Sequence, residues 1–215
     1  DGRICAVDAL IIKSAGQHTA ATLPPVDPRA LGKLFAPRSM AFIGASGQMG
    51  KWGHMLFTNV VSNGYEGAVY LVNPSRDMIS GRKTYKSVVD IPGPVDLAVV
   101  TIPAARVCDL IPELKEKRIK NMLLITSGFG ETGPEGKALE KQVMEKAREA
   151  GILIVGPNTM GIINPHINLY CTGSLVWPDP GGISVVAQSG NMGGQLLYFA
   201  EQQGIEIRAF SGSGN

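Results

Sequence analysis

The feature that most constrains the fold is a short apolar segment that runs directly into three glycines. Residues 41–50 read Ala-Phe-Ile-Gly-Ala-Ser-Gly-Gln-Met-Gly, with glycines at positions 44, 47 and 50. In the following residues, Lys51 to Val61, Trp52, Leu56 and Val60 stand at i, i+4 and i+8, which predicts an amphipathic helix. Free backbone N–H groups and the helix dipole favour a phosphate at such an N-terminus, and glycines let it approach the backbone. We therefore expect a phosphate site between this strand and this helix.

The end of the next expected strand indicates which phosphate ligand fits. Residues 68–72 are apolar and end in Asn73-Pro74-Ser75-Arg76, where an NAD site carries an acidic residue for the ribose hydroxyls. An arginine instead suits an additional phosphate on the ribose. Two ligands stay open on this argument: NADP with its 2′-phosphate and coenzyme A with its 3′-phosphate. The spacing Gly-x-x-Gly-x-x-Gly differs from the usual dinucleotide fingerprint and does not decide between them.

Short apolar segments alternate with helical patterns, which predicts an α/β fold with a doubly wound parallel sheet. The expected strands are residues 40–43, 68–72, 97–102, 122–126 and 152–155, and further helices are expected in residues 107–114 and 136–150. The carboxyl ends of such strands meet in one crevice. They carry Gly, Pro or small polar residues at 44–47, 73–74, 102–104, 127–129 and 156–158, so a binding site is expected there.

Composition divides the chain into parts. Residues 14–35 are polar and Pro-rich and are expected to be a linker after residues 1–13, with a boundary near Ala36. Residues 36–165 hold the expected parallel sheet. A loop-like stretch from Asn164 to Pro180 leads to residues 181–215, which repeat the order strand, glycine turn and helix. Because one strand–helix–strand unit cannot bury its own faces, we expect this to be the truncated start of a second α/β domain.

Composition also argues against several classes of protein. A formal net charge of +2 and an aromatic content of 6% give no basis for binding nucleic acid. No apolar run approaches the roughly 20 residues that span a bilayer, and the N-terminus lacks a signal-peptide pattern, so we expect a cytoplasmic protein without a membrane partner. The three scattered cysteines, Cys5, Cys108 and Cys171, fit reduced thiols better than disulfides or a metal site.

Six segments resemble, in the same order, segments of the NDP-forming (ADP-forming) acyl-CoA synthetases and, more distantly, of the α chain of succinyl-CoA synthetase. They are Leu-Phe-Ala-Pro-Arg-Ser-Met-Ala-Phe-Ile-Gly-Ala-Ser from Leu34, Val-Tyr-Leu-Val-Asn-Pro from Val69, Pro-Val-Asp-Leu-Ala-Val-Val-Thr-Ile-Pro-Ala from Pro94, Ser-Gly-Phe-Gly-Glu from Ser127, Gly-Pro-Asn-Thr-Met-Gly from Gly156 and Ala-Gln-Ser-Gly-Asn-Met-Gly from Ala187. The resemblance covers about residues 34–215. It favours coenzyme A over NADP. It implies a Rossmann-like CoA-binding domain in residues 36–165 and the start of a flavodoxin-like, succinyl-CoA-ligase-like domain in residues 181–215. Residues 1–13 resemble the closing strands of the family's ATP-grasp domain.

The resemblance implies roles for individual residues as well. Ser46, Gly47, Gln48 and Met49 would hold the coenzyme A phosphates, with Arg76 near the nucleotide. Ile102, Pro103 and Ala104 would line the adenosine or pantetheine side of coenzyme A, and Asn158 would lie near the thiol. Ser189, Gly190 and Asn191 would help to bind the transferred phosphate.

The chain departs from the family pattern at two places. The family passes phosphate onto a histidine in a Ser-His-Thr-Gly or Gly-His-Ala-Gly setting, and none of His18, His54 and His166 has those neighbours. Thr159-Met160 replaces the Cys-Leu or Cys-Pro that is common in the thiol-side loop.

The leading hypothesis is therefore the coenzyme A-binding part of an ADP-forming acid–CoA ligase, inactive by itself, with its phosphohistidine beyond Asn215 and no metal site of its own. ATP or ADP, Mg²⁺, a small carboxylic acid, an ATP-grasp domain or subunit and an oligomeric assembly would belong to the full-length enzyme. Two alternatives stay open. One is an NADP-dependent oxidoreductase, for which the scattered tyrosines Tyr65, Tyr70 and Tyr85 offer no Tyr-x-x-x-Lys pair. The other is a non-enzymatic acyl-CoA-sensing module of a protein acetyltransferase.

Overall fold

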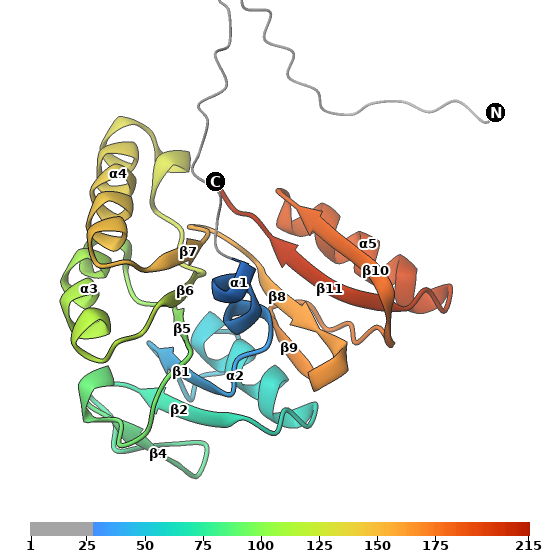
Figure 1. Ribbon diagram of the computed structural model, residues 1–215, viewed down its shortest axis with the longest axis horizontal. Coiled ribbons are helices and arrows are strands. Elements are labelled where there is room, and N and C mark those ends of the chain that lie inside the picture. Colours follow the sequence, from blue (N-terminus) through green and yellow to red (C-terminus); the bar gives the residue numbers. More distant parts are fainter. Residues whose placement is uncertain (1–27) are drawn as a thin grey trace, which may run out of the picture.

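The computed structural model describes residues 28–215, which form a seven-stranded and a four-stranded sheet (Figure 1). The larger sheet has the strand order β3-β4-β2-β1-β5-β6-β7. Its strands are β1 Ser39–Ile43, β2 Ala68–Val72, β3 Met78–Ile79, β4 Arg82–Tyr85, β5 Leu97–Val100, β6 Asn121–Leu124 and β7 Leu153–Val155. All neighbours pair in parallel except the β3–β4 hairpin at one edge. The predicted parallel sheet is confirmed, and the strand order reverses next to β1, where an open α/β sheet places its ligand crevice.

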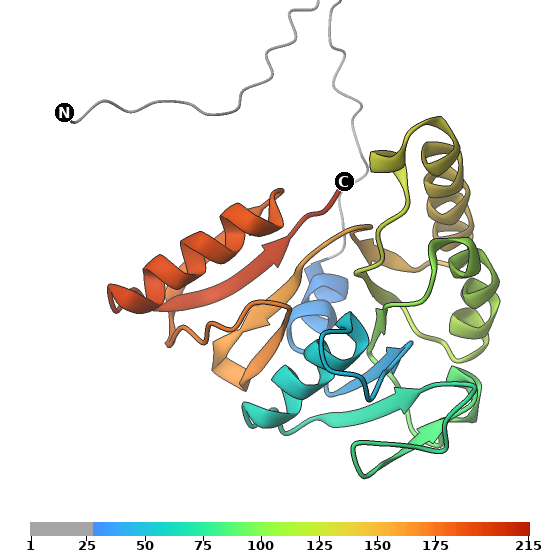
Figure 2. The same cartoon turned by 180° about the vertical axis from the view of Figure 1, so that it is seen from behind.

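Helices cover both faces of this sheet, which explains why its strands are continuous apolar runs (Figure 2). One face packs against α3 (Val107–Glu116) and α4 (Pro134–Glu149). The other face packs against α1 (Pro28–Phe35), α2 (Trp52–Ser62) and the hairpin of β8 (Gly161–Asn164) and β9 (Leu169–Thr172). Single 3-10 turns connect some of the elements: η1 Val88–Asp90, η2 Ala104–Arg106, η3 Gly130–Thr132 and η4 Pro165–Ile167.

The smaller sheet has the order β10-β11-β8-β9 and corrects two expectations. Its remaining elements are β10 Pro180–Ala187, α5 Gly190–Gln202 and β11 Ile207–Gly212. The stretch from Asn164 to Pro180 is not a loop throughout, because it contains β9. The strand–helix–strand unit of residues 181–215 does not stand alone, because β11 pairs antiparallel with β8 from within the predicted first domain. The boundary that composition suggested therefore cuts through one sheet.

The β8–β9 hairpin joins two hydrophobic cores because its side chains alternate between two covered faces. Ile162 packs with α2 and the larger sheet, whereas its neighbour Ile163 packs in a third core with Leu197 of α5 and Phe210 of β11. On β9, Tyr170 belongs to the same third core. This arrangement fixes α5 relative to the larger sheet.

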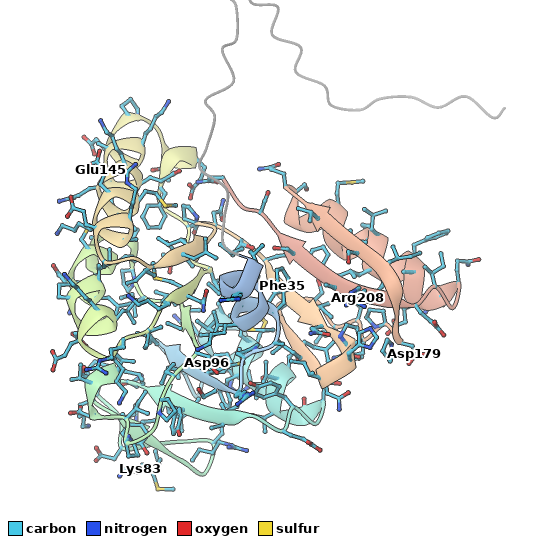
Figure 3. The ribbon with its side chains drawn as sticks, viewed as in Figure 1. Phe35, Lys83, Asp96, Glu145, Asp179 and Arg208 are labelled. Carbon is cyan, nitrogen blue, oxygen red and sulfur yellow. The ribbon has the colours of Figure 1, made fainter. Side chains whose placement is uncertain are left out.

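Part of the expected linker is also regular structure. Residues 28–35 form α1, whose Leu34 is fully buried. The end of α1 is held by a hydrogen bond from Asn164 Nδ2 to the Phe35 carbonyl (2.8 Å) and by an ion pair from Lys33 Nζ to Asp96 Oδ1 (3.4 Å). Figure 3 shows Phe35 and Asp96 in the middle of the molecule, with Lys83 and Glu145 at its margin. The rest of the expected linker, residues 14–27, and the expected ATP-grasp tail, residues 1–13, lie outside the described residues.

Within residues 28–215, no helix is both long enough and apolar enough to cross a membrane. The same residues contain no group of three or more His, Cys, Asp or Glu side chains placed to hold a metal ion. Cys108 and Cys171 are both buried free thiols, and burial raises the pKa of each.

Candidate functional site

A cavity of about 1420 Å³ lies over the carboxyl ends of the central strands. One wall consists of residues from the loops that follow β1, β2, β5, β6 and β7, together with the first residues of α2. The opposite wall consists of Gln188, Ser189 and the N-terminal part of α5 as far as Tyr198, together with residues 173–176 of the β9–β10 connection. The N-termini of two helices thus face the same space, as the sequence predicts for a crevice that binds anions.

The glycine loop after β1 packs too closely for side chains at two positions. Gly44 has a φ of +92°, and a Cβ atom on it would lie 2.8 Å from Thr101 Oγ1. A Cβ atom on Gly53, in the first turn of α2, would lie 2.2 Å from the Gly44 carbonyl oxygen. Because neither position carries a side chain, the helix begins directly against the loop and its N-terminus opens into the cavity.

Side-chain hydrogen bonds hold this loop in place. The Ser46 hydroxyl accepts a bond from the Gln48 N–H (3.1 Å), and the Asn73 amide donates to the Ala45 carbonyl (2.9 Å). Thr101 Oγ1 donates to the carbonyls of Ile43 and Gly44, both at 3.2 Å. The loop is therefore fixed from the neighbouring strands β2 and β5 as well as from α2.

The opposite wall is built around the start of α5. The Ser189 hydroxyl caps this helix by accepting a bond from the Met192 N–H at 3.2 Å, and Gly190 and Asn191 follow in the first turn. Across from them, Asn158 adopts a left-handed conformation with a φ of +57°. Its N–H donates to the Thr126 carbonyl (3.0 Å), so the β7–β8 loop is fixed to the end of β6.

A carboxylate just outside the cavity connects three of these loops. Glu131 accepts bonds from the Gly128 N–H, from the Phe129 N–H (3.1 Å) and from the Asn215 amide (2.5 Å). Asn158 Nδ2 in turn donates to Asn215 Oδ1 at 3.2 Å. Burial raises the pKa of the Glu131 carboxyl, but the bonds from Gly128, Asn215 and Phe129 outweigh it and the net pKa is lowered.

The cavity wall is polar and weakly cationic. Among residues 28–215, its lining contains no carboxylate, imidazole or thiol, and the titratable side chains in it are Lys51 and Tyr198. Amide side chains come from Gln48, Asn73, Asn158, Gln188, Asn191 and Gln195, and aliphatic hydroxyls come from Ser46, Thr101, Thr126, Ser127, Thr159, Ser174 and Ser189. Such a surface suits a large anionic ligand with many hydrogen-bonding groups, because nothing on it repels negative charge.

Comparison with known proteins identifies the family. The profile of the CoA binding domain family matches residues 38–165. The chain belongs to this family. The chain is also 41% identical over 186 residues to the Acetate–CoA ligase [ADP-forming] II subunit alpha of Pyrococcus furiosus, a match that covers 86% of this chain and 40% of that protein.

Solved structures agree with this assignment. The PH0766 protein of Pyrococcus horikoshii superposes with a TM-score of 0.81 at 39% identity, over 86% of this chain and 42% of that one. The dinucleotide forming Acetyl-coenzyme A synthetase 1 of Ca. Korarchaeum cryptofilum, in complex with phosphate and ADP, superposes with a TM-score of 0.80 at 32% identity, over 86% of this chain and 39% of that one. The predicted resemblance is thus confirmed, and the chain spans about two fifths of the length of these relatives.

The structure brings most of the predicted site residues together. Eight of the predicted residues line the cavity: Ser46, Gln48, Ile102, Pro103, Asn158, Ser189, Gly190 and Asn191. Four others do not line it: Gly47, Met49, Arg76 and Ala104. Met49 is 89% exposed, and Arg76 is exposed on the β2–β3 connection. The roles of all twelve residues in ligand binding stay predictions.

Other lining residues were not predicted from the sequence. Lys51 is the N-cap residue of α2 and lines the cavity. Its position directly after the third glycine was a sequence signal for a residue that contacts the phosphate. Trp52 was expected on the inner stripe of α2, but it is 45% exposed and lines the cavity. Gln195 and Tyr198 follow Asn191 at i+4 and i+7, so helical periodicity would have found them had the orientation of α5 been known.

The two described histidines lie outside the cavity lining. His54 is half-buried in α2, with Nδ1 3.2 Å from the Ser46 carbonyl oxygen and its ring edge-on to Phe57. His166 is exposed, with Nε2 3.0 Å from the Gly181 carbonyl oxygen. His18 lies outside the described residues.

Proposed function

We propose that this chain is the coenzyme A-binding part of an ADP-forming acid–CoA ligase. The observation that carries the proposal is the wall of the cavity, in which the described residues supply two helix N-termini, one lysine and a large set of amides and hydroxyls, but no carboxylate. Coenzyme A is the ligand for which the family is named. It carries a diphosphate, a ribose phosphate and two amides, and each of these finds matching donors or acceptors in such a wall.

Within this proposal, the diphosphate lies at the N-terminus of α2. Ser46, Gln48 and Lys51 line this end, and the backbone N–H groups of Gly47 and Met49 would add donors. Arg76 would approach the 3′-phosphate from outside the cavity. Ile102, Pro103 and Ala104 would lie along the adenosine or pantetheine portion, which directs the thiol toward Asn158.

The start of α5 would hold negative charge next to that thiol. The Ser189 hydroxyl already bonds the Met192 N–H, which leaves the first N–H groups of the helix, at Gly190 and Asn191, directed toward the ligand side. A carboxylate, an acyl phosphate or free phosphate bound there would sit beside Asn158. The role of these residues is to bind and orient, because the described lining has no histidine to carry a phosphoryl group and no carboxylate or imidazole to abstract a proton at neutral pH.

The remaining functions of the ligase would come from other parts of the full-length protein. These are the binding of ATP or ADP with Mg²⁺, an ATP-grasp domain or subunit, the phosphohistidine and an oligomeric assembly in the cytoplasm. The NADP-dependent oxidoreductase is less well supported, because the lining has no carboxylate or imidazole and Lys51 and Tyr198 come from different helices. An acyl-CoA-sensing module would use the same cavity, and the sequence of the full-length gene product distinguishes it from the ligase.

Calorimetric titration of this chain with coenzyme A, NADP and NAD tests the proposal. We expect coenzyme A to bind at least about tenfold more tightly than either dinucleotide, a difference of about 1.4 kcal/mol. Tighter binding of NADP would contradict the proposal and favour the oxidoreductase.

A further inference from the structure

One methionine lies along the first two turns of α5, at the end of the cavity where the proposed function places the acid. A Cβ atom built on Gly190 would lie 3.3 Å from Met160 Cβ and 3.8 Å from its sulfur. A Cβ atom built on Gly194, one turn further, would lie 3.9 Å from Met160 Cε and 3.2 Å from Ser174 Oγ. The Met160 side chain therefore runs beside both glycines, and all four residues line the cavity.

The backbone on either side of Met160 is held firmly. Thr159 is buried, its hydroxyl donates to the Gly212 carbonyl (2.5 Å) and it accepts a bond from the Gly161 N–H (3.1 Å). A Cβ atom on Gly212 would lie 3.0 Å from Met160 Cγ, so the base of the side chain is confined between β11 and α5. Only the thioether end, toward Gly194 and Ser174, has freedom to move.

Met160 therefore forms part of the cavity wall beside the first two turns of α5. An acid whose carboxyl group is held by the first N–H groups of the helix directs its substituent along the same turns, toward Met160, Gly194 and Ser174. Besides the small residues Gly190, Gly194 and Ser174, this wall has the apolar side chains of Met160, Leu175 and Val176, and none of the described residues there carries a charge that could recognise a polar tail. The space available to the substituent is therefore limited by the thioether end of Met160.

We propose that Met160 sets the upper size of the acid and that the site takes short aliphatic carboxylic acids, with longer or aromatic acids excluded. The inference rests on the proposed function and adds the substrate class to it. Overfilling a close-packed site is unfavourable because side chains and backbone must shift, so a bulky acyl group binds less well until the obstructing side chain is shortened.

The test compares thioesters that differ only in the acyl group: acetyl-CoA, butyryl-CoA, hexanoyl-CoA and benzoyl-CoA, with free coenzyme A as the reference. Titrated into this chain, acetyl-CoA should bind within about threefold of coenzyme A, and hexanoyl-CoA and benzoyl-CoA at least about tenfold more weakly. Met160→Ala should reduce the tenfold difference to about threefold or less. Met160→Leu keeps the volume and should retain the parent's selectivity.

A second variant is designed to reduce the space for the acyl group, whereas Met160→Ala enlarges it. Gly194→Ala adds a methyl group between Ser174 Oγ and Met160 Cε and also raises helix propensity, so the protein should fold. It should weaken butyryl-CoA relative to coenzyme A by at least about fivefold. Met192→Ala is the matched control, because Met192 is on the same helix, is 58% exposed and does not line the cavity. This control should leave every ratio unchanged.

The outcomes separate the inference from the proposed function. The size limit is overturned if the parent binds hexanoyl-CoA as tightly as acetyl-CoA. It is also overturned if Met160→Ala leaves the ratio of these two affinities unchanged. In either case, binding of coenzyme A still supports the proposed function. If Met160→Ala no longer binds coenzyme A, the Gly194→Ala variant is the test of the size limit. The inference is overturned if Gly194→Ala binds butyryl-CoA, relative to coenzyme A, as tightly as the parent does. A parent that binds no coenzyme A contradicts the proposed function and the inference with it.

Discussion

Two basic side chains are candidates to hold phosphates of coenzyme A, and they stand in different places. Lys51 lines the cavity at the N-cap of α2, where the unpaired N–H groups of the helix already favour an anion. Arg76 is exposed outside the lining, on the connection from β2 to β3, and its carbonyl accepts a bond from Thr84 Oγ1. The two residues should therefore contact different phosphates.

Arg76→Ala tests the contact with the ribose phosphate. Loss of one charge-assisted bond should weaken coenzyme A by about 1.5 kcal/mol, or about tenfold. Dephospho-coenzyme A, which lacks that phosphate, should bind the variant and the parent alike. Arg82→Ala, on the neighbouring strand β4, controls for the general loss of positive charge at this edge. Equal losses for both ligands would show that Arg76 acts elsewhere.

Lys51→Ala tests the contact with the diphosphate, which both ligands carry. Coenzyme A and dephospho-coenzyme A should weaken by the same factor, about tenfold, in calorimetric titrations. The exposed Lys137 on α4 provides the control substitution, which should change neither affinity. A loss confined to coenzyme A would place Lys51 at the ribose phosphate and contradict the assignment.

The Glu131 carboxylate makes a pH-dependent contribution to stability. Its pKa is lowered in the folded chain, so the fold favours the charged form; this stabilisation is present above the ordinary pKa of 4.5 and is lost as the pH falls through the folded value. Because the side chain is exposed, Glu131→Ala should lower the free energy of unfolding at pH 7 by no more than about 1 kcal/mol. Urea denaturation should find the variant and the parent converging below pH 4.5. A difference that stays constant with pH would contradict this account.

At the scale of elements, the contact between α2 and the loop after β1 positions the phosphate site. Gly53→Ala would place a methyl group 2.2 Å from the Gly44 carbonyl oxygen and 3.0 Å from Thr101 Oγ1, so the helix must move outward. We expect a loss of about 1–3 kcal/mol in the free energy of unfolding, which exceeds the gain in helix propensity, together with weaker coenzyme A binding.

Gly32→Ala in α1 provides the matched control for this helix substitution. Nothing lies within 4 Å of the added Cβ, so the variant should be as stable as the parent or more stable by up to about 1 kcal/mol. Urea denaturation and calorimetry measure both effects. A Gly53→Ala protein with parental stability and affinity would show that α2 can shift without cost.

Elements could be predicted from the sequence where both of their faces are covered. Every residue of β1 and β5 is buried, and all of them except Ser39 are apolar. The β8–β9 hairpin was missed because its strands have four residues each and are interrupted by Asn164, Pro165 and Asn168, and because its partner β11 lies more than 30 residues further along the chain. In α1, Pro28 occupies the helix start, where proline is favourable, but the surrounding prolines suggested a linker.

The same physical reasoning accounts for what could be predicted of the site. Residues that follow parallel strands, such as Ser46 and Asn158, were predicted because topology alone brings them to one crevice. Tyr198 and Gln195 could not be placed, because their position depends on how the β8–β9 hairpin fixes α5 above the larger sheet. Ser174 lies in a connection without any periodic pattern.

At the scale of the whole molecule, the cavity exists because two sheets are held together. Its first wall belongs to the larger sheet and α2, its second wall to α5, and the β8–β9 hairpin packs into the cores of both (Figures 1 and 2). Among the described residues, neither wall contributes a carboxylate or a histidine. This agrees with the proposed role of the site, which is to bind and orient ligands.

The last prediction is that this chain does not by itself make acyl-CoA from an acid, ATP and coenzyme A. A phosphoryl relay needs a nucleophile in line with a donor that is held with Mg²⁺. His54 and His166 lie outside the cavity lining, each with a ring nitrogen near a backbone carbonyl, and the chain spans about two fifths of the length of its relatives. We expect no ADP release that depends on acid and coenzyme A.

Incubation with radiolabelled ATP should likewise leave no acid-labile, base-stable phosphate on His18, His54 or His166. The same preparation must bind coenzyme A in a calorimeter, which shows that inactivity does not arise from misfolding. Turnover should appear only in a longer protein that supplies a phosphate-carrying histidine and a nucleotide-binding domain. Turnover by this chain alone, abolished by substituting one of its three histidines, would contradict the proposal, because the catalytic nucleophile would then lie within the chain.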